Sequence, residues 1–250
     1  ASGGFASVSS LRADALSQEM VELLQQCGHK TFTLAPEAGS QRLRTAIAKN
    51  LSDDELFRAV RILARYKIPN IKLYFMIGLP TETEHDVQEI VRLVKEIKHF
   101  YFKEAKSEKW LNHIQLSVSP FVPKPCTPFQ WHPFEEVAGL KQKIRLITGA
   151  LKKERKVAVS YDLPKWGYVQ TLLSRGDRRV GRLLIKAFER DGDWTAAFRE
   201  SDINPDFYVY RHRTYEERLP WDFIRHAVSK KRLWEEYQKA LGRRGEKSLR

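Results

Sequence analysis

Cysteine is scarce in this chain of 250 residues. The two cysteines, Cys27 and Cys126, lie far apart in the sequence, which argues against a disulfide framework and against a self-contained zinc site. The seven histidines are scattered and form no HxxxH pair. The sequence therefore offers no closed metal site of its own.

Long apolar runs are also missing. No stretch approaches the roughly 20 apolar residues that span a bilayer, and the longest run, Leu73–Leu79, suits a buried strand. The N-terminus has no basic region followed by an apolar run, which a secretory signal would show. We therefore expect a cytoplasmic protein without a membrane partner.

Acidic residues are the minority among the charged ones. The chain has 44 Lys and Arg against 31 Asp and Glu, a formal net charge of +13. Such a surplus attracts polyanions such as RNA. A solvated basic surface with a charged tail at residues 242–250 explains the same surplus, and both interpretations stay open.

Short apolar runs alternate with helical patterns over residues 1–162. The apolar runs predict strands at Phe5–Ser10, Thr31–Ala35, Ile71–Ile77, Ile114–Ser119 and Lys156–Tyr161. The periodic segments predict helices at Ser17–Gln26, Ser40–Ala48, Ser52–Tyr66, Glu84–Lys98 and Phe134–Lys153. Ser52 and Glu55 have capping-box spacing, and an i, i+3, i+4 apolar stripe follows them. Strands joined by helical crossovers form a parallel sheet. About five such units are too few to close an eight-stranded barrel, so the sequence predicts an α/β fold with a partial, open parallel β/α barrel.

The pattern changes after Asp162. Helical patterns at Trp166–Ser174, Arg178–Arg190 and Trp221–Leu241 enclose a stretch without clear periodicity, Ser201–Leu219. We therefore predict three parts: the partial barrel at 1–162, a mostly helical appendage at 163–241, and a basic tail at 242–250.

Loops that directly follow the predicted strands are the expected place for chemistry, since parallel barrels carry their functional residues at the carboxyl ends of strands. Four segments qualify: Ala35–Ser40, Gly78–Thr83, Pro120–Pro125 and Tyr161–Asp162. Each alone could be an ordinary turn. Several at one rim favour a ligand site.

Three of these segments carry a family resemblance. Glu37-Ala38-Gly39-Ser40 with the following Gln41–Arg44 resembles the fourth-strand segment of radical S-adenosylmethionine (SAM) enzymes. Phe75–Thr83 resembles their fifth-strand segment and its turn. Val118–Pro125 resembles their sixth-strand segment, in the branch that often carries a cobalamin-binding domain upstream. Asp162 and the run Ser174–Arg179 resemble one uncharacterised subgroup of that branch, and the similarity extends from about residue 7 to 241.

The resemblance implies roles for individual residues. Glu37 matches the position that contacts the SAM ribose or amino group, and Lys49 the position of a cation for the SAM carboxylate. Gly78, Leu79 and Val122 match positions beside the adenine. Tyr74 stands where some members carry an aspartate for the ribose. The predicted SAM-binding set is Glu37, Ser40, Lys49, Tyr74, Gly78, Leu79, Pro80 and Val122.

The sequence departs from the family in lacking two of its motifs. It contains neither the CxxxCxxC spacing that holds the family's [4Fe–4S] cluster nor the Gly-Gly-Glu segment for the SAM amine. We expect that the chain begins inside the barrel and that its partner is the missing N-terminal half of the same protein. A degenerate member without radical chemistry is the alternative.

The resemblance also implies an activity for the complete protein. With SAM and a reduced [4Fe–4S] cluster whose ligands lie outside this chain, it would form a 5′-deoxyadenosyl radical. The branch that it resembles adds cobalamin, which an absent upstream domain would bind. Methylation or sulfur insertion on an unknown substrate, RNA among the possibilities, is the expected reaction. This chain alone would be inactive.

Residues for the substrate are predicted at Arg12, Asp162, Arg175, Asp177 and Arg178. Arginine forks suit phosphate or carboxylate groups. A rim salt bridge of Arg12 with Asp14, and a charged helix connector at Arg175–Arg179, are the structural alternatives.

A second functional hypothesis is a non-catalytic RNA-binding module on an α/β scaffold. Aromatic and basic residues interleave between Tyr208 and Tyr215, a pattern that suits stacking on unpaired bases. A strand with tyrosines turned inward and arginines outward would show the same pattern.

Overall fold

The structure is a computed structural model that describes residues 11–225 and 227–242. The predicted strand Phe5–Ser10 lies outside these residues. The chain divides into two compact units: unit 1 comprises Ala1–Ser119 and Lys141–Asp162, and unit 2 comprises Pro120–Leu140 and Leu163–Arg250. This division and the predicted one share the boundary after Asp162, but Pro120–Leu140 falls in unit 2.

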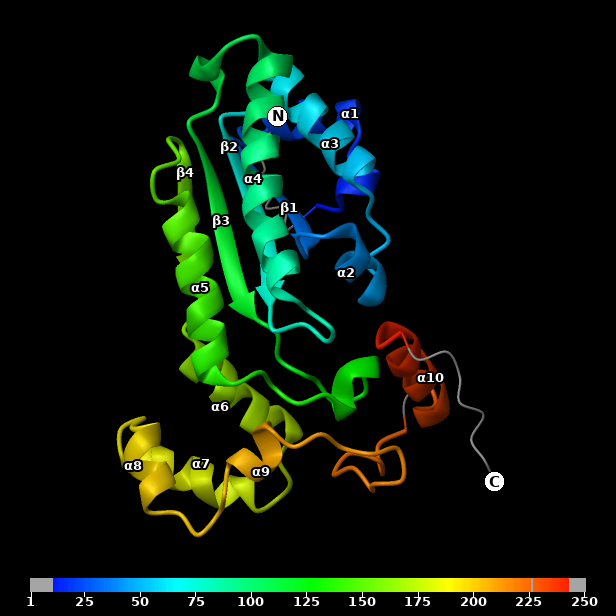
Figure 1. Ribbon diagram of the computed structural model, residues 1–250, viewed down its shortest axis with the longest axis vertical. Coiled ribbons are helices and arrows are strands. Elements are labelled where there is room, and N and C mark those ends of the chain that lie inside the picture. Colours follow the sequence, from blue (N-terminus) through cyan, green and yellow to red (C-terminus); the bar gives the residue numbers. More distant parts are fainter. Residues whose placement is uncertain (1–10, 226, 243–250) are drawn as a thin grey trace, which may run out of the picture. The chain divides into compact units, whose positions relative to one another are not determined.

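A four-stranded sheet forms the centre of unit 1 (Figure 1). Its strands are β1 (Thr31–Glu37), β2 (Asn70–Ile77), β3 (His113–Pro120) and β4 (Val157–Tyr161), in the spatial order β1-β2-β3-β4. The ladders are parallel, with Phe32 opposite Ile71 and Ile114 opposite Val157. The predicted α/β class with an open parallel sheet is confirmed.

Helices connect the strands of unit 1 as parallel pairing requires. They are α1 (Gln18–Gln26), α2 (Gln41–Ala46), α3 (Asp53–Arg65), α4 (Glu84–Ala105) and α5 (Val137–Leu151), with 3₁₀ turns η1 (Ala13–Ala15) and η2 (Glu108–Trp110). The predicted capping box at Ser52 and Glu55 is present at the start of α3. Helix α4 runs beyond the predicted end at Lys98 because Tyr101 is fully buried and donates to the Ile68 carbonyl at 2.7 Å.

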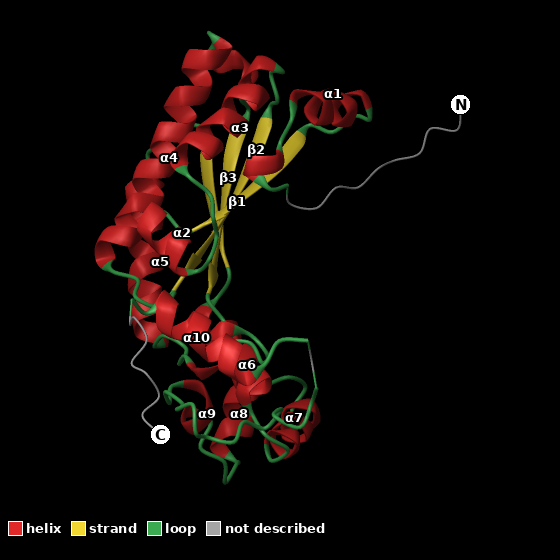
Figure 2. Ribbon diagram, turned by 90° about the vertical axis from the view of Figure 1, so that its right-hand side faces the viewer, coloured by secondary structure: helices red, strands yellow, loops and turns green. Residues whose placement is uncertain are grey.

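The two faces of the sheet differ. Helices α3, α4 and α5 lie along one face (Figure 2), and the side chains on that face are buried: Leu34, Leu73, Phe75, Leu116 and Val118. The alternate residues on the other face are half-buried and mostly polar: Thr33, Lys72, Tyr74, Gln115 and Ser117. The second face therefore corresponds to the inner, ligand-facing side expected of a partial barrel.

Unit 2 is helical. Its elements are η3 (Pro128–Trp131), α6 (Pro164–Arg175), α7 (Val180–Glu189), α8 (Trp194–Arg199), α9 (Asp206–Val209) and α10 (Lys230–Ala240). Trp131, Leu219, Trp221, Leu233 and Tyr237 form a buried cluster. Because Trp131 is at the centre of this cluster, the segment Pro120–Leu140 belongs to unit 2.

Two sequence-based predictions for unit 2 are wrong. The helix expected at Trp221–Leu241 begins only at Lys230, where the Ser229 hydroxyl caps it, and Trp221 lies in a turn with its indole donating to Gln130 at 2.6 Å. The Tyr/Arg segment is not a strand with outward arginines, since Tyr208 lies on the short helix α9 and Arg213 is 2% exposed.

Among the described residues, no helix combines the length and the apolar character that a membrane span needs.

Candidate functional site

Glu37 and the Gly78 turn lie at the same edge of the sheet. Glu37 is the last residue of β1, and Gly78 directly follows the last residue of β2. These strands are parallel neighbours, so their carboxyl ends meet at one edge. Both residues have positive φ, 69° at Glu37 and 80° at Gly78, and the ladder is irregular between Leu34 and Glu37. The backbone thus leaves the sheet sharply at both positions, as ligand-binding edges often do.

Lys49 comes to the same edge. Its ammonium nitrogen lies 3.3 Å from Oε1 of Glu37, and its backbone N–H donates to the Arg44 carbonyl at 2.8 Å. The two side chains are 32% and 26% exposed, so a ligand can reach both charges. Glu37 and Lys49 thus lie together at the edge where β1 ends.

The loop between β1 and α2 is fixed by close packing. A Cβ atom on Gly39 would lie 2.3 Å from the backbone nitrogen of Ile90 in α4, so only glycine fits there. The fully buried Arg44 donates to the carbonyls of Ala38 at 3.1 Å and Gly39 at 2.9 Å and pairs with Asp53. These contacts hold Glu37 in a rigid loop.

Ser40 is used to build this loop. Its hydroxyl accepts the N–H of Leu43 at 3.1 Å, which caps α2, and donates to the buried Asp86. Asp86 also accepts from Thr83 at 2.8 Å, which caps α4, and pairs with Arg42. Burial opposes ionisation, but the hydrogen bonds from Ser40, Thr83 and Arg42 prevail and lower the pKa of Asp86 to about 2. In the structure, Ser40 therefore has a structural role.

The Gly78 turn has a network of its own. The Gly78 N–H donates to Oε1 of Glu82 at 2.9 Å, and the Lys143 ammonium lies 2.6 Å from the same oxygen. Leu79 and Pro80 are buried. Since the Gly78 N–H is already bonded, adenine contacts at this turn would fall to its other backbone groups.

Tyr74 lies on the half-buried face of β2. The Lys72 ammonium is 4.6 Å from the centroid of its ring. Both side chains thus face the inner side of the sheet, away from helices α3 to α5. Of the remaining predicted positions, Val122 is half-buried and belongs to unit 2.

The predicted substrate residues divide between the units. In unit 1, Arg12 forms a 2.6 Å ion pair with Asp14, and Asp162 is exposed just after β4. In unit 2, Asp177 pairs with Arg179 at 2.6 Å, while Arg178 is exposed.

Arg175 is different, since it is fully buried. Its guanidinium donates to the carbonyls of Val209 and Arg211, each at 2.8 Å. Burial and repulsion from Arg213 and Arg211 lower its pKa. Through these contacts Arg175 holds the segment after α9, which is a structural role. Its position in a charged run of the sequence did not indicate this role.

Sequence reasoning missed Arg44, Arg42 and Asp86 as supports of the site. Arg42 and Arg44 stand inside the quoted motif, and Asp86 stands three residues after Thr83 at capping-box spacing. That spacing was the available signal for Asp86. No nearby sequence signal indicated that the carboxylate of Asp86 would bond at the starts of both α2 and α4.

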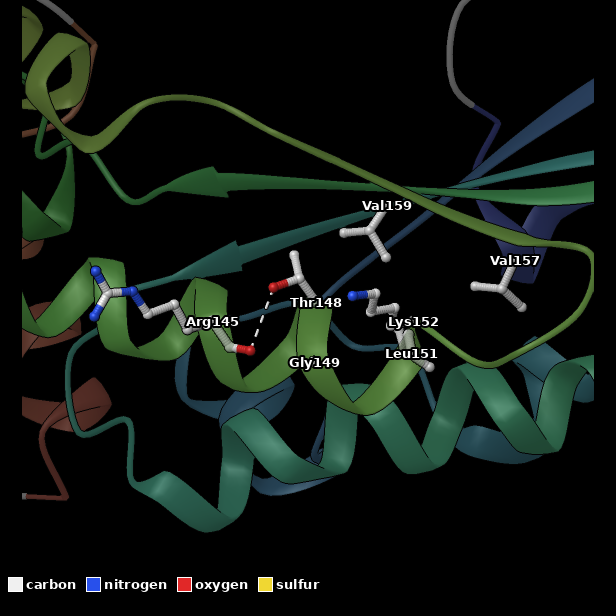
Figure 3. A pocket seen from close by; sticks show the side chains of 7 residues that line it. All are labelled: Arg145, Thr148, Gly149, Leu151, Lys152, Val157 and Val159. Carbon is white, nitrogen blue, oxygen red and sulfur yellow. Dashed lines mark hydrogen bonds between the residues drawn. The ribbon is translucent and has the colours of Figure 1, made fainter.

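A groove on unit 1 lies elsewhere. It has a volume of about 340 Å³ and runs between α5 and β4. It is lined by Arg145 and Thr148 on the helix, by Lys152 directly after it, and by Val157 and Val159 on the strand (Figure 3). Strand β4 is at the opposite end of the sheet from β1. The groove is therefore separate from the edge that holds Glu37.

Metal ligands are absent from the part of the chain that the structure describes: no group of three His, Cys, Asp or Glu side chains is placed to hold a metal ion there. Cys27 is exposed and Cys126 half-buried.

Residues 5–94 match the model of the Radical SAM superfamily. This match contains β1, β2 and the first half of α4. Glu37, Lys49 and the Gly78 turn all fall within the matched segment.

Three curated proteins are similar to parts of the chain. An uncharacterized protein of Methanocaldococcus jannaschii is 37% identical over 178 residues, 71% of this chain and 36% of that protein. The tRNA-2-methylthio-N(6)-dimethylallyladenosine synthase of a Sulfurihydrogenibium species is 34% identical over 89 residues, 34% of this chain and 20% of the synthase. A second uncharacterized M. jannaschii protein is 21% identical over 123 residues, 49% of this chain and 22% of that protein. The chain thus spans about a third or less of the length of these relatives.

Proposed function

We propose that this chain binds S-adenosylmethionine at the edge formed by Glu37, Lys49 and the Gly78 turn, as part of a radical SAM enzyme. The observation that carries the proposal is the accessible Glu37–Lys49 ion pair at 3.3 Å, at the carboxyl end of a strand in the radical SAM domain. The amino-acid end of SAM carries one ammonium and one carboxylate. The pair offers a group of opposite charge for each.

The chain's own residues would orient SAM. Glu37 would accept from the ammonium or the ribose hydroxyls, and Lys49 would donate to the carboxylate. The positive φ of Glu37 and the rigid Gly39 loop hold the acceptor in place before the ligand arrives, which lowers the entropy cost of binding. Leu79 and Pro80 are buried, so the turn would meet the adenine through its backbone rather than through these two side chains.

The iron–sulfur cluster of the family does not fit the described residues, because they hold no set of three metal ligands. Radical chemistry would need cluster ligands from outside this chain, and this chain alone is proposed to be inactive.

The reaction that we propose for the complete enzyme is methylation or sulfur insertion. One relative is named as a tRNA methylthiolation enzyme, which supports an RNA substrate. The association with cobalamin depends on the Val118–Pro125 motif alone and stays a prediction, as do Val122 in the adenine site and Arg12, Asp162 and Arg178 in the substrate site.

Equilibrium dialysis of the chain against labelled SAM tests the proposal. We expect saturable binding that S-adenosylhomocysteine competes with, because both ligands share the adenosine and amino-acid ends. Glu37→Gln should weaken binding about tenfold, the loss of one charged hydrogen bond. Glu96→Gln removes a carboxylate from an exposed α4 ion pair and should leave binding unchanged. Absence of saturable binding, or equal loss in both variants, would refute the SAM site.

A further inference from the structure

Unit 2 contains an aromatic cavity that the SAM proposal does not use. It has a volume of about 310 Å³. Five aromatic side chains and one lysine contribute to its lining: Lys165, Trp166, Tyr168, Trp194, Phe198 and Tyr210. Asp193 lines it as well, with its carboxylate accepting the N–H groups of Thr195 and Ala196 at the start of α8. They come from α6, from α8 and from the residue after α9. Their convergence in space is invisible in the sequence.

The rings are fixed before any ligand arrives. Tyr168 packs edge to face against Phe198 at 5.8 Å and against Tyr210 at 5.5 Å between centroids. Its hydroxyl donates to Asp206 at 2.5 Å, and burial raises the pKa of Tyr168. The tyrosine therefore stays neutral at physiological pH, and its ring cannot rotate away. The cavity is thus a preformed aromatic surface.

The mouth of the cavity combines an exposed indole with a cation. The side chain of Trp166 is 43% exposed, although it is large and hydrophobic. The Lys165 ammonium lies 5.0 Å from the centroid of the Trp166 ring. Because this ammonium lies over one face of the ring, a flat ligand would stack on the other face, with the positive charge close by.

We propose that this cavity binds an unpaired nucleobase of an RNA strand, with Lys165 contacting the adjacent phosphate. Aromatic faces stack on bases of any identity, and a nearby cation pairs with the strand's backbone. The volume accommodates one base with its sugar rather than a folded segment. The Asp193 carboxylate is already bonded to two backbone N–H groups of α8, which leaves Lys165 as the charge offered to a ligand, and the net charge of +13 favours a polyanion. This inference goes beyond SAM binding and does not depend on it.

Fluorescence anisotropy of labelled single strands tests the proposal on the intact chain. The probes are an oligoadenylate and an abasic strand of the same length, which share the phosphates and differ only in the bases. We expect the oligoadenylate to bind about tenfold more tightly, as stacking of a base on an aromatic ring predicts. Trp166→Ala should abolish this difference, and Trp166→Phe should retain most of it. Lys165→Gln should weaken both strands and reduce the dependence on salt.

Phe223→Ala is the matched control. Phe223 is an aromatic residue of unit 2 that is 79% exposed and lies outside the cavity, so its removal should leave both affinities unchanged. Equal affinity for the two strands, or a preference for bases that survives in Trp166→Ala, would overturn the proposal and assign the cavity to another occupant, such as an aromatic side chain of a partner protein. Competition by free AMP at equal nucleotide concentration would overturn the RNA strand as the ligand. Loss of SAM binding would leave all these outcomes unaffected.

Discussion

The ammonium nitrogen of Lys49 lies 3.3 Å from the carboxylate oxygen Oε1 of Glu37. The two residues are twelve positions apart in the chain. Both side chains are about a quarter to a third exposed. A pair this accessible contributes little to stability, since water screens it. The pair instead presents two opposite charges at one edge of the sheet.

The first prediction concerns the geometry of the Lys49 contact. Lys49→Met should weaken SAM binding about tenfold, because the carboxylate of the ligand loses its cation. Lys49→Arg should bind at least as tightly as the natural chain, because a guanidinium grips a carboxylate with two parallel hydrogen bonds. Calorimetric titration with SAM measures both. If Lys49→Arg behaved like Lys49→Met, the carboxylate would not be the group that Lys49 contacts.

The second prediction concerns the close approach of Gly39 to α4. Gly39→Ala should lower the free energy of unfolding by about 2 kcal/mol or more, since its Cβ would meet backbone atoms that cannot move aside. Gly149→Ala on α5 is the control: no atom lies within 4 Å of its Cβ position, and alanine in a helix should stabilise by about 0.5–1 kcal/mol. Urea unfolding of both variants measures these two changes in the free energy of unfolding. Equal effects would mean that the loop is not packed against α4.

The third prediction follows from Asp86. Its pKa lies at about 2 in the folded chain against an ordinary 3.8. A carboxyl group whose pKa is lowered by folding stabilises the folded state at every pH above its ordinary pKa. This contribution of about 2 kcal/mol is lost as the pH falls from about 4 to about 2. Asp86→Asn should remove this part of the acid dependence, whereas Glu84→Gln in the same helix turn should retain it. Circular dichroism at a series of pH values measures the midpoint. An unchanged acid midpoint in Asp86→Asn would contradict the assignment.

The fourth prediction concerns His132 in unit 2. Burial, with repulsion from His212 and Arg175, lowers its pKa from 6.5 to about 4. The unfolded chain takes up this proton first, so unit 2 should lose roughly 3 kcal/mol of stability as the pH falls from about 6.5 to about 4. Tryptophan fluorescence follows unit 2 well, because every tryptophan except Trp110 lies there.

The matching variants are His132→Gln and His99→Gln. The first removes the buried imidazole and should flatten the pH dependence between 6.5 and 4, even if it also lowers stability at neutral pH. The second removes an exposed histidine of α4 and should change nothing. A pH dependence that persists in His132→Gln would mean that other groups cause it.

Much of unit 1 could be predicted because its signals are local. The capping box at Ser52 and the apolar stripe after it predicted α3, and the apolar run ending at Ile77 predicted β2. The motif around Glu37 predicted the edge of the sheet. Each of these signals is contained within a few turns of helix or one strand, where the periodicity of side chains determines the structure.

Unit 2 was harder because its determinants are far apart in the chain. Nothing near Arg175 indicates that its partners are carbonyls at Val209 and Arg211. Trp221 continued an apolar pattern into α10, but its indole is drawn to Gln130, 91 residues away. Tertiary contacts overrode the local pattern in both cases.

The position of Trp131 has a consequence for how the chain can be divided. The segment that carries it leaves unit 1 after β3 and returns at Lys141, yet its burial requires Trp221 and Tyr237 near the end of the chain. During synthesis, the Trp131 indole therefore stays uncovered until Trp221 and Tyr237 have emerged. A fragment cut after Asp162 would keep the sheet but display that indole permanently, and should aggregate for this reason.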